Sequence, residues 1–454
     1  MKNPKEQKGK TAYLFSNRDL AFLILPLMVE QFLVILVGMA DTIMIASVGE
    51  SAVSGVSLVD QVMILWISLF SALATGGAVV VGQYLGQKKV EKAREASWQM
   101  VWFGTFCAIG IMLLLYMGKT FVLQVVFGKI QADVRNHADI YFMIVTASIP
   151  FVAIYNLTAA IFRTMGDSRT PMQVSVLMNL INVAGNAALI YGVHLGTPGV
   201  AIPTLTSRVI AALILLLLLF NKKRELYLKA TWRYRPDWSM IGRILSIGIP
   251  NGLENSMFQL GKILVLSLIS TFGTYAIAAN AVSNAVALFQ ILPGMAMTLA
   301  VTPVIARCVG AGDYRQVTYY NKKFLILTHI SMAVVVGGLF LIRPQILEAY
   351  HLSARTAEVT GRILTFHGIC AVLIWPASFT LPCTFRATGD AKVCMYISIF
   401  SMWIFRIAFS YILGSYFHMG VFGVWVAMVI DWVFRTSCFL LRYRSGKWKK
   451  EALV

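Results

Sequence analysis

Long apolar stretches separated by short polar and charged segments recur along the whole of this 454-residue sequence. A helix needs about 20 apolar residues to cross a bilayer. Twelve such stretches occur, at 20–46, 55–80, 95–118, 138–162, 170–192, 199–220, 244–270, 277–305, 322–345, 360–385, 392–415 and 420–441. The pattern predicts an all-α polytopic membrane protein with twelve transmembrane helices.

The two halves of the chain repeat each other. The hexapeptide Phe-Arg-Thr-Met-Gly-Asp at 162–167 returns as Phe-Arg-Ala-Thr-Gly-Asp at 385–390, 223 residues later. Further pairs keep a step of 224 residues: Pro26 and Pro250, Glu30 and Glu254, Gly86 and Gly310, and Gly199 and Gly423. Since six spans return the chain to its starting side, the halves are predicted to be parallel repeats, as in many secondary transporters.

This plan divides the chain into four parts. We expect an N-terminal lobe over 1–221, a cytoplasmic connector over 222–243, a C-terminal lobe over 244–443 and a basic cytoplasmic tail over 444–454. Prolines inside the spans, Pro150 among them, predict bends in the helices.

The charge of the chain sets its orientation. Only 13% of the residues are charged, whereas soluble domains carry about 25%. The net charge is +19, and 29 of the 39 Lys and Arg residues fall on one side of the predicted topology. The opposite side carries six: Lys119, Lys129, Arg135, Arg343, Arg355 and Arg362. This bias predicts a protein of the plasma (inner) membrane with both termini cytoplasmic, and it argues against nucleic-acid binding.

Motifs for catalysis or cofactor binding do not occur in the sequence. The six cysteines lack the spacing of metal ligands, so free thiols are expected. Gly118-Lys119-Thr120 resembles the end of a phosphate-binding loop, but Leu113 replaces the first glycine that the loop requires. We therefore expect neither enzymatic activity nor a cofactor.

Acidic residues inside the first half mark candidate sites, because charge is costly in lipid. Glu30 and Asp41 share one face of the first span and lie about 16 Å apart along the helix axis. They are candidates for a path for H⁺ or Na⁺. The alternative is that each carboxyl group is protonated or hydrogen-bonded for packing alone. Asp60 lies near the start of its span, where an interfacial position is favoured.

Three asparagines, Asn179, Asn182 and Asn186, lie on one face of the fifth span, and the sixth carries Thr204. Such groups either hold membrane helices together or offer oxygen ligands to a hard cation near Asp41. The spacing leaves both interpretations open.

The second half carries charges inside its spans as well: Glu254, Lys262, Arg406, Asp431 and Arg435. The i, i+4 spacing of Asp431 and Arg435 predicts an ion pair within one helix. We expect Glu254, Arg406, Asp431 and Arg435 to form a structural charge network, since an unpaired charge in lipid is worse.

The repeated hexapeptide predicts two helix ends. Its glycines favour positive φ where the chain leaves a helix. Asp167 and Asp390 are expected to cap the next helix, while Arg163 and Arg386 are expected to reach lipid phosphates or helix carbonyls.

Six motifs occur together in this chain: Pro26–Glu30, Gly38–Asp41, Ala74–Gly86, Gly248–Ser256, Ala306–Gly312 and Asp431–Arg435. As a set they resemble the multidrug and toxic compound extrusion (MATE) family, in its bacterial NorM-like branch, over essentially all twelve spans. The resemblance implies two lobes around a central cavity. It also implies a secondary antiporter for multidrug efflux, which exports amphipathic, often cationic organic compounds in exchange for H⁺ or Na⁺ by alternating access.

The resemblance places the coupling site in the first half. The family's first-helix aspartate falls on Asp41, and further site residues fall on Asn182, Asn186 and Thr204. Asn186 stands where the family has an aspartate, which removes one negative charge. The cation site of some relatives in the second half has no match, since Glu254 is displaced by about one turn. We expect coupling of H⁺ or Na⁺ through Asp41, in a monomer surrounded by membrane lipids.

One alternative remains open at this point, and a second is disfavoured. A flippase for a lipid-linked saccharide, found in the same superfamily, would need a cationic cavity, for which Lys262, Arg406 and Arg435 are candidates. A membrane-embedded enzyme would need a nucleophile, a metal cluster or a His/acid pair on neighbouring turns, and the sequence shows none.

Overall fold

The computed structural model describes residues 13–128, 130–229 and 234–454. Some basic residues that were counted in the sequence analysis lie outside these ranges. They are the lysines before residue 13, Lys129, and Arg233 of the connector. Within the described ranges the elements are helices, and no strand occurs. The all-α fold class predicted from the sequence is confirmed.

The first half contains six membrane helices, as predicted. They are α1 (Asn17–Ala46), α2 (Glu50–Gly86), α3 (Val90–Met117), the pair α5 (Ala132–Thr146) and α6 (Ile149–Thr164), α7 (Arg169–Ala187) with the π-helix η2 (Ala188–Gly192), and α8 (Pro198–Leu219). The short α4 (Lys119–Phe121) and η1 (Val122–Val126) precede α5. The pair α5–α6 is bent by 47° beside Pro150, so the predicted proline bend is present here.

The second half repeats this order. Its helices are α9 (Trp238–Ser270), α10 (Thr274–Gly310), α11 (Tyr314–Leu341), the short α12 (Arg343–Ala349), α13 (Ala354–Trp375) with η3 (Pro376–Thr380) and α14 (Leu381–Ala387), α15 (Ala391–Ser401) with η4 (Met402–Ala408), α16 (Phe409–Tyr411) and η5 (Ile412–Tyr416), and α17 (Gly420–Arg444).

Most of these helices are long and apolar enough to span a membrane. In the described part of the chain ten qualify, or eleven when the bent pair α5–α6 counts as one span. The remaining predicted span is α9, which is 33 residues long. Polar residues such as Asn251, Glu254 and Lys262 lower its hydropathy, and Asn251 and Glu254 are buried inside the protein. The chain is a multi-pass membrane protein built from two six-helix repeats.

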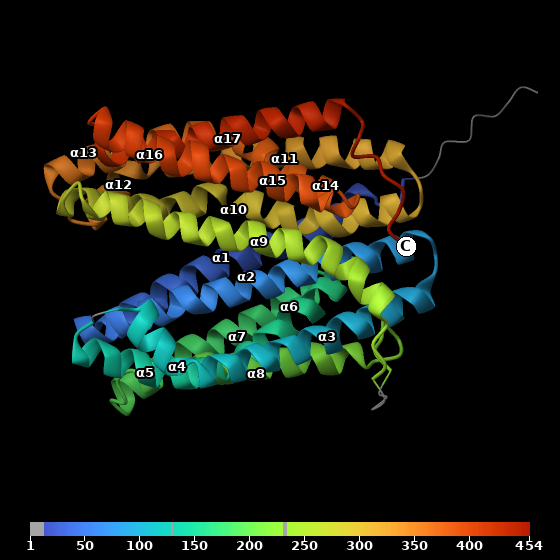
Figure 1. The fold of residues 1–454 in the computed structure, drawn as a ribbon, viewed down its shortest axis with the longest axis horizontal. Coiled ribbons are helices and arrows are strands. Elements are labelled where there is room, and N and C mark those ends of the chain that lie inside the picture. The colour runs from blue at the N-terminus through green and yellow to red at the C-terminus, as the bar shows by residue number, and fades with distance from the viewer. Residues whose placement is uncertain (1–12, 129, 230–233) are drawn as a thin grey trace, which may run out of the picture.

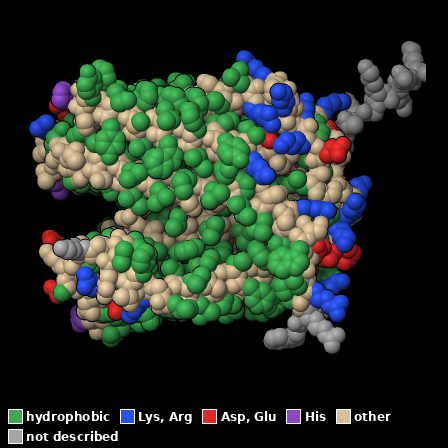
Figure 2. Space-filling model, in the orientation of Figure 1, with side chains coloured by type: hydrophobic (Ala, Val, Ile, Leu, Met, Phe, Trp, Pro, Cys, Tyr) green, Lys and Arg blue, Asp and Glu red, His purple; other side chains and the backbone are tan. Residues whose placement is uncertain are grey.

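The two repeats lie side by side and meet along their first two helices. Figure 1 shows α1–α8 in one bundle and α9–α17 in the other. Between them α2 packs against α9 and α10, and α1 packs against α10. Figure 2 shows the molecule hollowed between the bundles at one end, while Lys and Arg side chains gather at the other end. The halves therefore close at the basic end and separate at the opposite end.

Two glycines of the internal repeat allow the halves to touch at the closed end. A Cβ atom on Gly86 would lie 2.1 Å from the carbonyl oxygen of Arg307, and one on Gly310 would lie 2.0 Å from that of Gln83. Gln83 and Arg307 are themselves 224 residues apart. The contact is therefore symmetric, and backbone meets backbone with no room for a side chain.

We predict that Gly310→Ala lowers the melting midpoint of the purified protein. The added methyl group meets a backbone carbonyl that cannot rotate away, so the halves must separate at a cost of about 1–3 kcal/mol. The matched control is Gly338→Ala on α11, where a Cβ meets nothing within 4 Å. If both variants melt at the same temperature, the close contact contributes nothing.

Chain segments near both ends also cross this interface. The backbone N–H of Leu14 donates to Gln316 Oε1 of α11 at 2.8 Å, so the segment before α1 is held by the second half. Leu453 N–H donates to Gln83 Oε1 of α2 at 2.8 Å, and Gln83 Nε2 donates to the carbonyl of Ala387 at 2.9 Å. These bonds tie the two halves together at the basic end.

Candidate functional site

Asp41, Asn186, Asn182 and Thr204 form one hydrogen-bonded chain across α1, α7 and α8. Asn186 Nδ2 donates to Asp41 Oδ1 at 2.7 Å and to Asn182 Oδ1 at 3.4 Å. Asn182 Nδ2 donates to Thr204 Oγ1 at 3.1 Å, and Thr204 Oγ1 donates to the carbonyl of Val200 at 2.8 Å. The structure thus brings Asp41 together with three residues of the fifth and sixth spans, and we call the four residues the Asp41 chain.

The chemistry of the Asp41 chain suits a small cation. Asp41 is only partly buried, so its carboxylate can exchange with solvent. Asn186 Oδ1 is buried and accepts no hydrogen bond within the described residues. A carboxylate and an amide oxygen are the ligands that a hard cation such as Na⁺ prefers, and the same carboxylate can take a proton. The role in cation coupling stays a prediction.

Three polar residues near the Asp41 chain are not bonded to it, and two of them, Asp60 and Arg208, have other partners. Asp60 Oδ1 accepts a hydrogen bond from Tyr141 Oη at 3.0 Å. Arg208 donates to Ser148 Oγ at 2.8 Å. Asn179 lies on the same helix as the Asp41 chain, and its Nδ2 has no hydrogen-bond partner in the described ranges. Asn179 is therefore not part of the chain, although its spacing grouped it with Asn182 and Asn186.

Glu30 lies apart from the Asp41 chain, in a buried ion pair. Its two carboxylate oxygens lie 2.7 and 2.9 Å from Arg163 Nη2, and Tyr155 Oη donates to Oε1 at 3.3 Å. Glu30 is 4% exposed. The structure shows no hydrogen bond between Glu30 and the Asp41 chain. Of the two carboxylates predicted to form a cation path, only Asp41 is bonded to the asparagines.

The same ion pair recurs in the second half. Arg386 Nη2 lies 2.7 Å from Glu254 Oε2. Glu30 and Glu254 are repeat partners, and so are Arg163 and Arg386. The prediction that these arginines reach lipid or helix carbonyls is wrong, because each neutralises a buried carboxylate instead. The signal was present in the sequence, since an acid and an arginine were both duplicated in nearly the same register.

The charge network of the second half is connected differently from the prediction. Arg435 Nη2 lies 3.4 Å from Glu254 Oε1 on α9, whereas no ion pair joins Arg435 to Asp431 among the described residues. Asp431 lies 3.9 Å from Arg406 and accepts a hydrogen bond from Ser401. The predicted intrahelical pair is therefore wrong, because each member finds an opposite charge on another helix.

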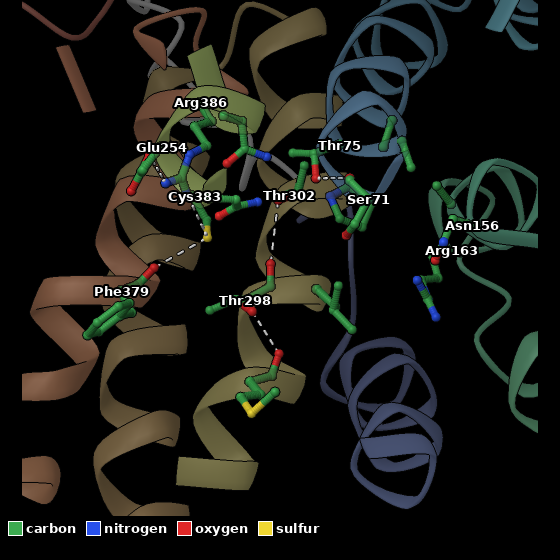
Figure 3. Close-up of a pocket in the computed structure, with 18 of the residues that line it drawn as sticks. Ser71, Thr75, Asn156, Arg163, Glu254, Thr298, Thr302, Phe379, Cys383 and Arg386 are labelled. Atoms are coloured by element: carbon green, nitrogen blue, oxygen red, sulfur yellow. Dashed lines mark hydrogen bonds and ion pairs between the residues drawn. The ribbon is translucent and has the colours of Figure 1, made fainter. Parts of the chain in front are cut away.

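A cavity of about 310 Å³ lies between the two halves and is lined by both. Figure 3 shows Glu254 and Arg386 on the wall formed by the second half, while Arg163 lies across the cavity on the first half. The Nε atoms of Arg163, Arg386 and Arg435 are buried without a hydrogen-bond partner in the described part of the chain. Uncharged lining residues include Ser71, Thr75, Asn156, Thr298, Thr302 and Phe379. The cavity therefore combines apolar walls with polar groups and with charges of both signs.

The other predictions for the repeated hexapeptide are confirmed only in part. Gly166 and Gly389 have φ of 88° and 86°, as predicted for helix ends. Asp167 accepts from the backbone N–H of Thr170 at 3.0 Å and caps α7. Burial raises the pKa of Asp167, but hydrogen bonds from Thr170 and the charge of Arg224 outweigh this and hold the pKa below its usual value. Asp390 caps no helix and pairs instead with basic groups near the end of the chain.

The structure confirms the predicted free thiols. All six cysteines are unpaired. No group of three or more His, Cys, Asp and Glu side chains within these ranges is arranged to hold a metal ion.

Comparisons with known proteins agree on one family. The sequence model of the MatE family matches residues 26–188 and again 250–412, two ranges in the register of the internal repeat. A probable multidrug resistance protein NorM of Thermotoga maritima is 27% identical over 441 residues, which cover 96% of this chain and 94% of that protein. An uncharacterized transporter, YisQ, of Bacillus subtilis is 25% identical over 464 residues, 99% of this chain and 98% of that protein.

Solved structures show the same fold. An outward-facing multidrug resistance MATE family transporter superposes with a TM-score of 0.88 at 20% sequence identity, over 95% of this chain and 96% of the other. A MATE structure in a bent conformation superposes with a TM-score of 0.86 over the same shares of the two chains, again at 20% identity.

Proposed function

Because this chain belongs to the MatE family of membrane transporters, we propose that it is a secondary antiporter which exports amphipathic organic compounds in exchange for H⁺ or Na⁺. Relatives named as probable multidrug resistance proteins support multidrug efflux as the activity. The Asp41 chain carries the proposal, since it offers the cation a carboxylate and amide oxygens inside the membrane. We further propose a monomer in the plasma membrane.

We propose that the open end of the molecule faces outward. Lys and Arg gather at the closed end (Figure 2), which the positive-inside rule assigns to the cytoplasm. In this state a cation from outside reaches Asp41, and the central cavity releases its substrate to the same side. Closure at the outer end and separation at Gly86 and Gly310 would then expose the cavity to the cytoplasm.

Coupling in this mechanism requires that cation and substrate favour different conformations. A ligand that binds two conformations equally well shifts no equilibrium between them. A cation at Asp41 would recruit Asn186 Oδ1, which now has no partner among the described residues. This change would repack α1 against α7, which are in contact here, and would reduce the space open to substrate in the first half.

The proposal is tested by efflux of ethidium, an amphipathic cation, from proteoliposomes. A pH gradient and a Na⁺ gradient are imposed separately, each with the membrane potential clamped. We expect one inward cation gradient to accelerate efflux, and an ionophore that collapses this gradient to abolish the acceleration. Efflux at the rate of protein-free vesicles under both gradients would contradict antiport.

A further inference from the structure

A pocket in the second half occupies the place that the Asp41 chain occupies in the first. It has a volume of about 310 Å³ and lies between α9, α10, η4 and α17. Its lining includes Val265, Arg406 and Met428. The 224-residue step of the repeat carries Asp41 to Val265, Asn182 to Arg406 and Thr204 to Met428. The repeat therefore places a second pocket here, with different chemistry.

The charge of this pocket is opposite to that of the Asp41 chain. Lys262 and Arg406 line it, and no carboxylate does so within the described residues. Both cations lie over one ring, that of Phe258, with Lys262 Nζ at 5.1 Å and the Arg406 guanidinium carbon at 4.8 Å from its centre. With Asp431 at 3.9 Å from Arg406 as the counter-charge, two cations beside one ring still leave a net positive charge, which an anion bound nearby would offset.

The two cations are also short of partners. Arg406 is largely buried, yet its guanidinium donates no hydrogen bond to the described residues, and its one acidic neighbour, Asp431, is 3.9 Å away. Lys262 forms no ion pair or hydrogen bond in the same ranges. A guanidinium has five N–H donors in a fork that matches a carboxylate, sulfonate or phosphate. Several donors are therefore available for one anionic group.

The rest of the pocket suits the body of an organic molecule. Leu266, Ile269, Leu288 and Trp425 supply apolar walls, and Asn280 and Asn284 supply amides. Trp425 Nε1 donates to Asn280 Oδ1 at 3.1 Å, so the indole ring is fixed in place. An aromatic compound bearing one negative group would bury its ring against these walls.

We propose that this pocket binds the anionic group of an amphipathic organic substrate, with Lys262 and Arg406 as its ligands. This proposal rests on the antiport function proposed above, because only that function makes the bound anion a transported substrate. Corresponding places in the two halves would then hold opposite charges, the coupling cation at Asp41 and an anionic or zwitterionic substrate at Lys262 and Arg406. The same chemistry fits a free organic anion and a lipid headgroup.

The test is equilibrium binding of three isosteric fluorescent probes to the purified protein in phosphatidylcholine nanodiscs. The probes are 2-naphthoate, 2-naphthamide and 2-naphthamidine, which carry a negative, a neutral and a positive group on one ring system. We expect naphthoate to bind about tenfold tighter than the amide, the gain of one charge-assisted contact. Equal affinities for all three probes would overturn the proposal.

Variants locate the binding. Lys262→Gln should weaken naphthoate binding about tenfold or more with little effect on folding, because Lys262 has no acidic partner to lose. Arg406→Lys keeps the charge near Asp431 and should weaken binding less than Arg406→Gln. The matched control is Arg355→Gln, a cation of the same half that lies over Tyr275 outside the pocket. Unchanged naphthoate affinity in folded Lys262→Gln would overturn the assignment.

Two further experiments are needed. One distinguishes a lipid headgroup from a free organic anion as the ligand, and the other distinguishes a failure of the antiport proposal from a failure of the pocket proposal. If a lipid headgroup occupies the pocket, phosphatidylglycerol in the nanodisc should weaken naphthoate binding to the wild type and leave Lys262→Gln unaffected. No effect of phosphatidylglycerol assigns the pocket to free organic anions. Asp41→Asn should keep naphthoate binding, so a failure of cation-driven efflux alone would count against antiport and not against this pocket.

Discussion

Asp41→Asn should abolish cation-driven efflux and leave a folded protein in the membrane. Asparagine keeps the shape of the side chain and can still bond to Asn186, which lies 2.7 Å from Asp41 here. It can neither take up a proton nor offer a negative charge to Na⁺. Without a cation that distinguishes the two conformations, the gradient has no means to drive the cycle. We expect efflux to fall to the rate of protein-free vesicles.

The control for this variant is Asp139→Asn on α5. Asp139 pairs with Lys119 at 2.9 Å on the less basic side of the molecule and is partly exposed. The substitution makes the same change of charge in the same half, and gradient-driven efflux should be retained. Wild-type rates in Asp41→Asn would remove Asp41 from the coupling mechanism, and loss of activity in both variants would show that the effect is not specific.

Arg163→Met should destabilise the protein strongly, by about 3–5 kcal/mol. The substitution leaves the Glu30 carboxylate, 4% exposed, with only the Tyr155 hydroxyl at 3.3 Å. Adding Glu30→Gln should recover most of the loss, because the double variant has no buried charge to compensate. Arg386→Met should have a smaller effect, since Glu254 keeps Arg435 at 3.4 Å.

Thermal unfolding followed with a thiol-reactive dye measures these differences. Cys308 and Cys394 are free and fully buried, so they react only when the helices separate. The exposed pair of Lys92 and Glu95 supplies the control, and Lys92→Met should leave the melting midpoint unchanged. Equal midpoints for Arg163→Met and the wild type would mean that the ion pair contributes nothing to stability.

Periodicity and repetition in the sequence were sufficient to predict the helices. Apolar runs located the membrane helices because lipid requires about 20 apolar residues per span. Asn182 and Asn186 were grouped correctly since both lie on one helix face, and Asp41 and Thr204 were already considered as their neighbours before the family resemblance selected the same four residues. Local spacing was informative for Asn182 and Asn186, but it also grouped Asn179 with them, and Asn179 is not part of the Asp41 chain.

Contacts between helices were harder to predict. Asp431 and Arg435 have the spacing of an intrahelical pair, yet Arg435 turns to Glu254 on α9. A single sequence does not reveal which helices are neighbours, so it could not show that Arg163 faces Glu30. The duplication of both residues was consistent with an ion pair. Only the structure shows that Arg163 on α6 lies beside Glu30 on α1.

The most direct test of coupling at Asp41 is the affinity for substrate as the coupling cation is varied. Ethidium binding to the purified protein is measured across pH and Na⁺ concentration, for the wild type and for Asp41→Asn. Because linkage is reciprocal, the coupling cation should weaken ethidium binding to the wild type by about 5- to 150-fold. The affinity of Asp41→Asn should not change with either cation. A variant that responds to the cation as the wild type does would contradict the mechanism.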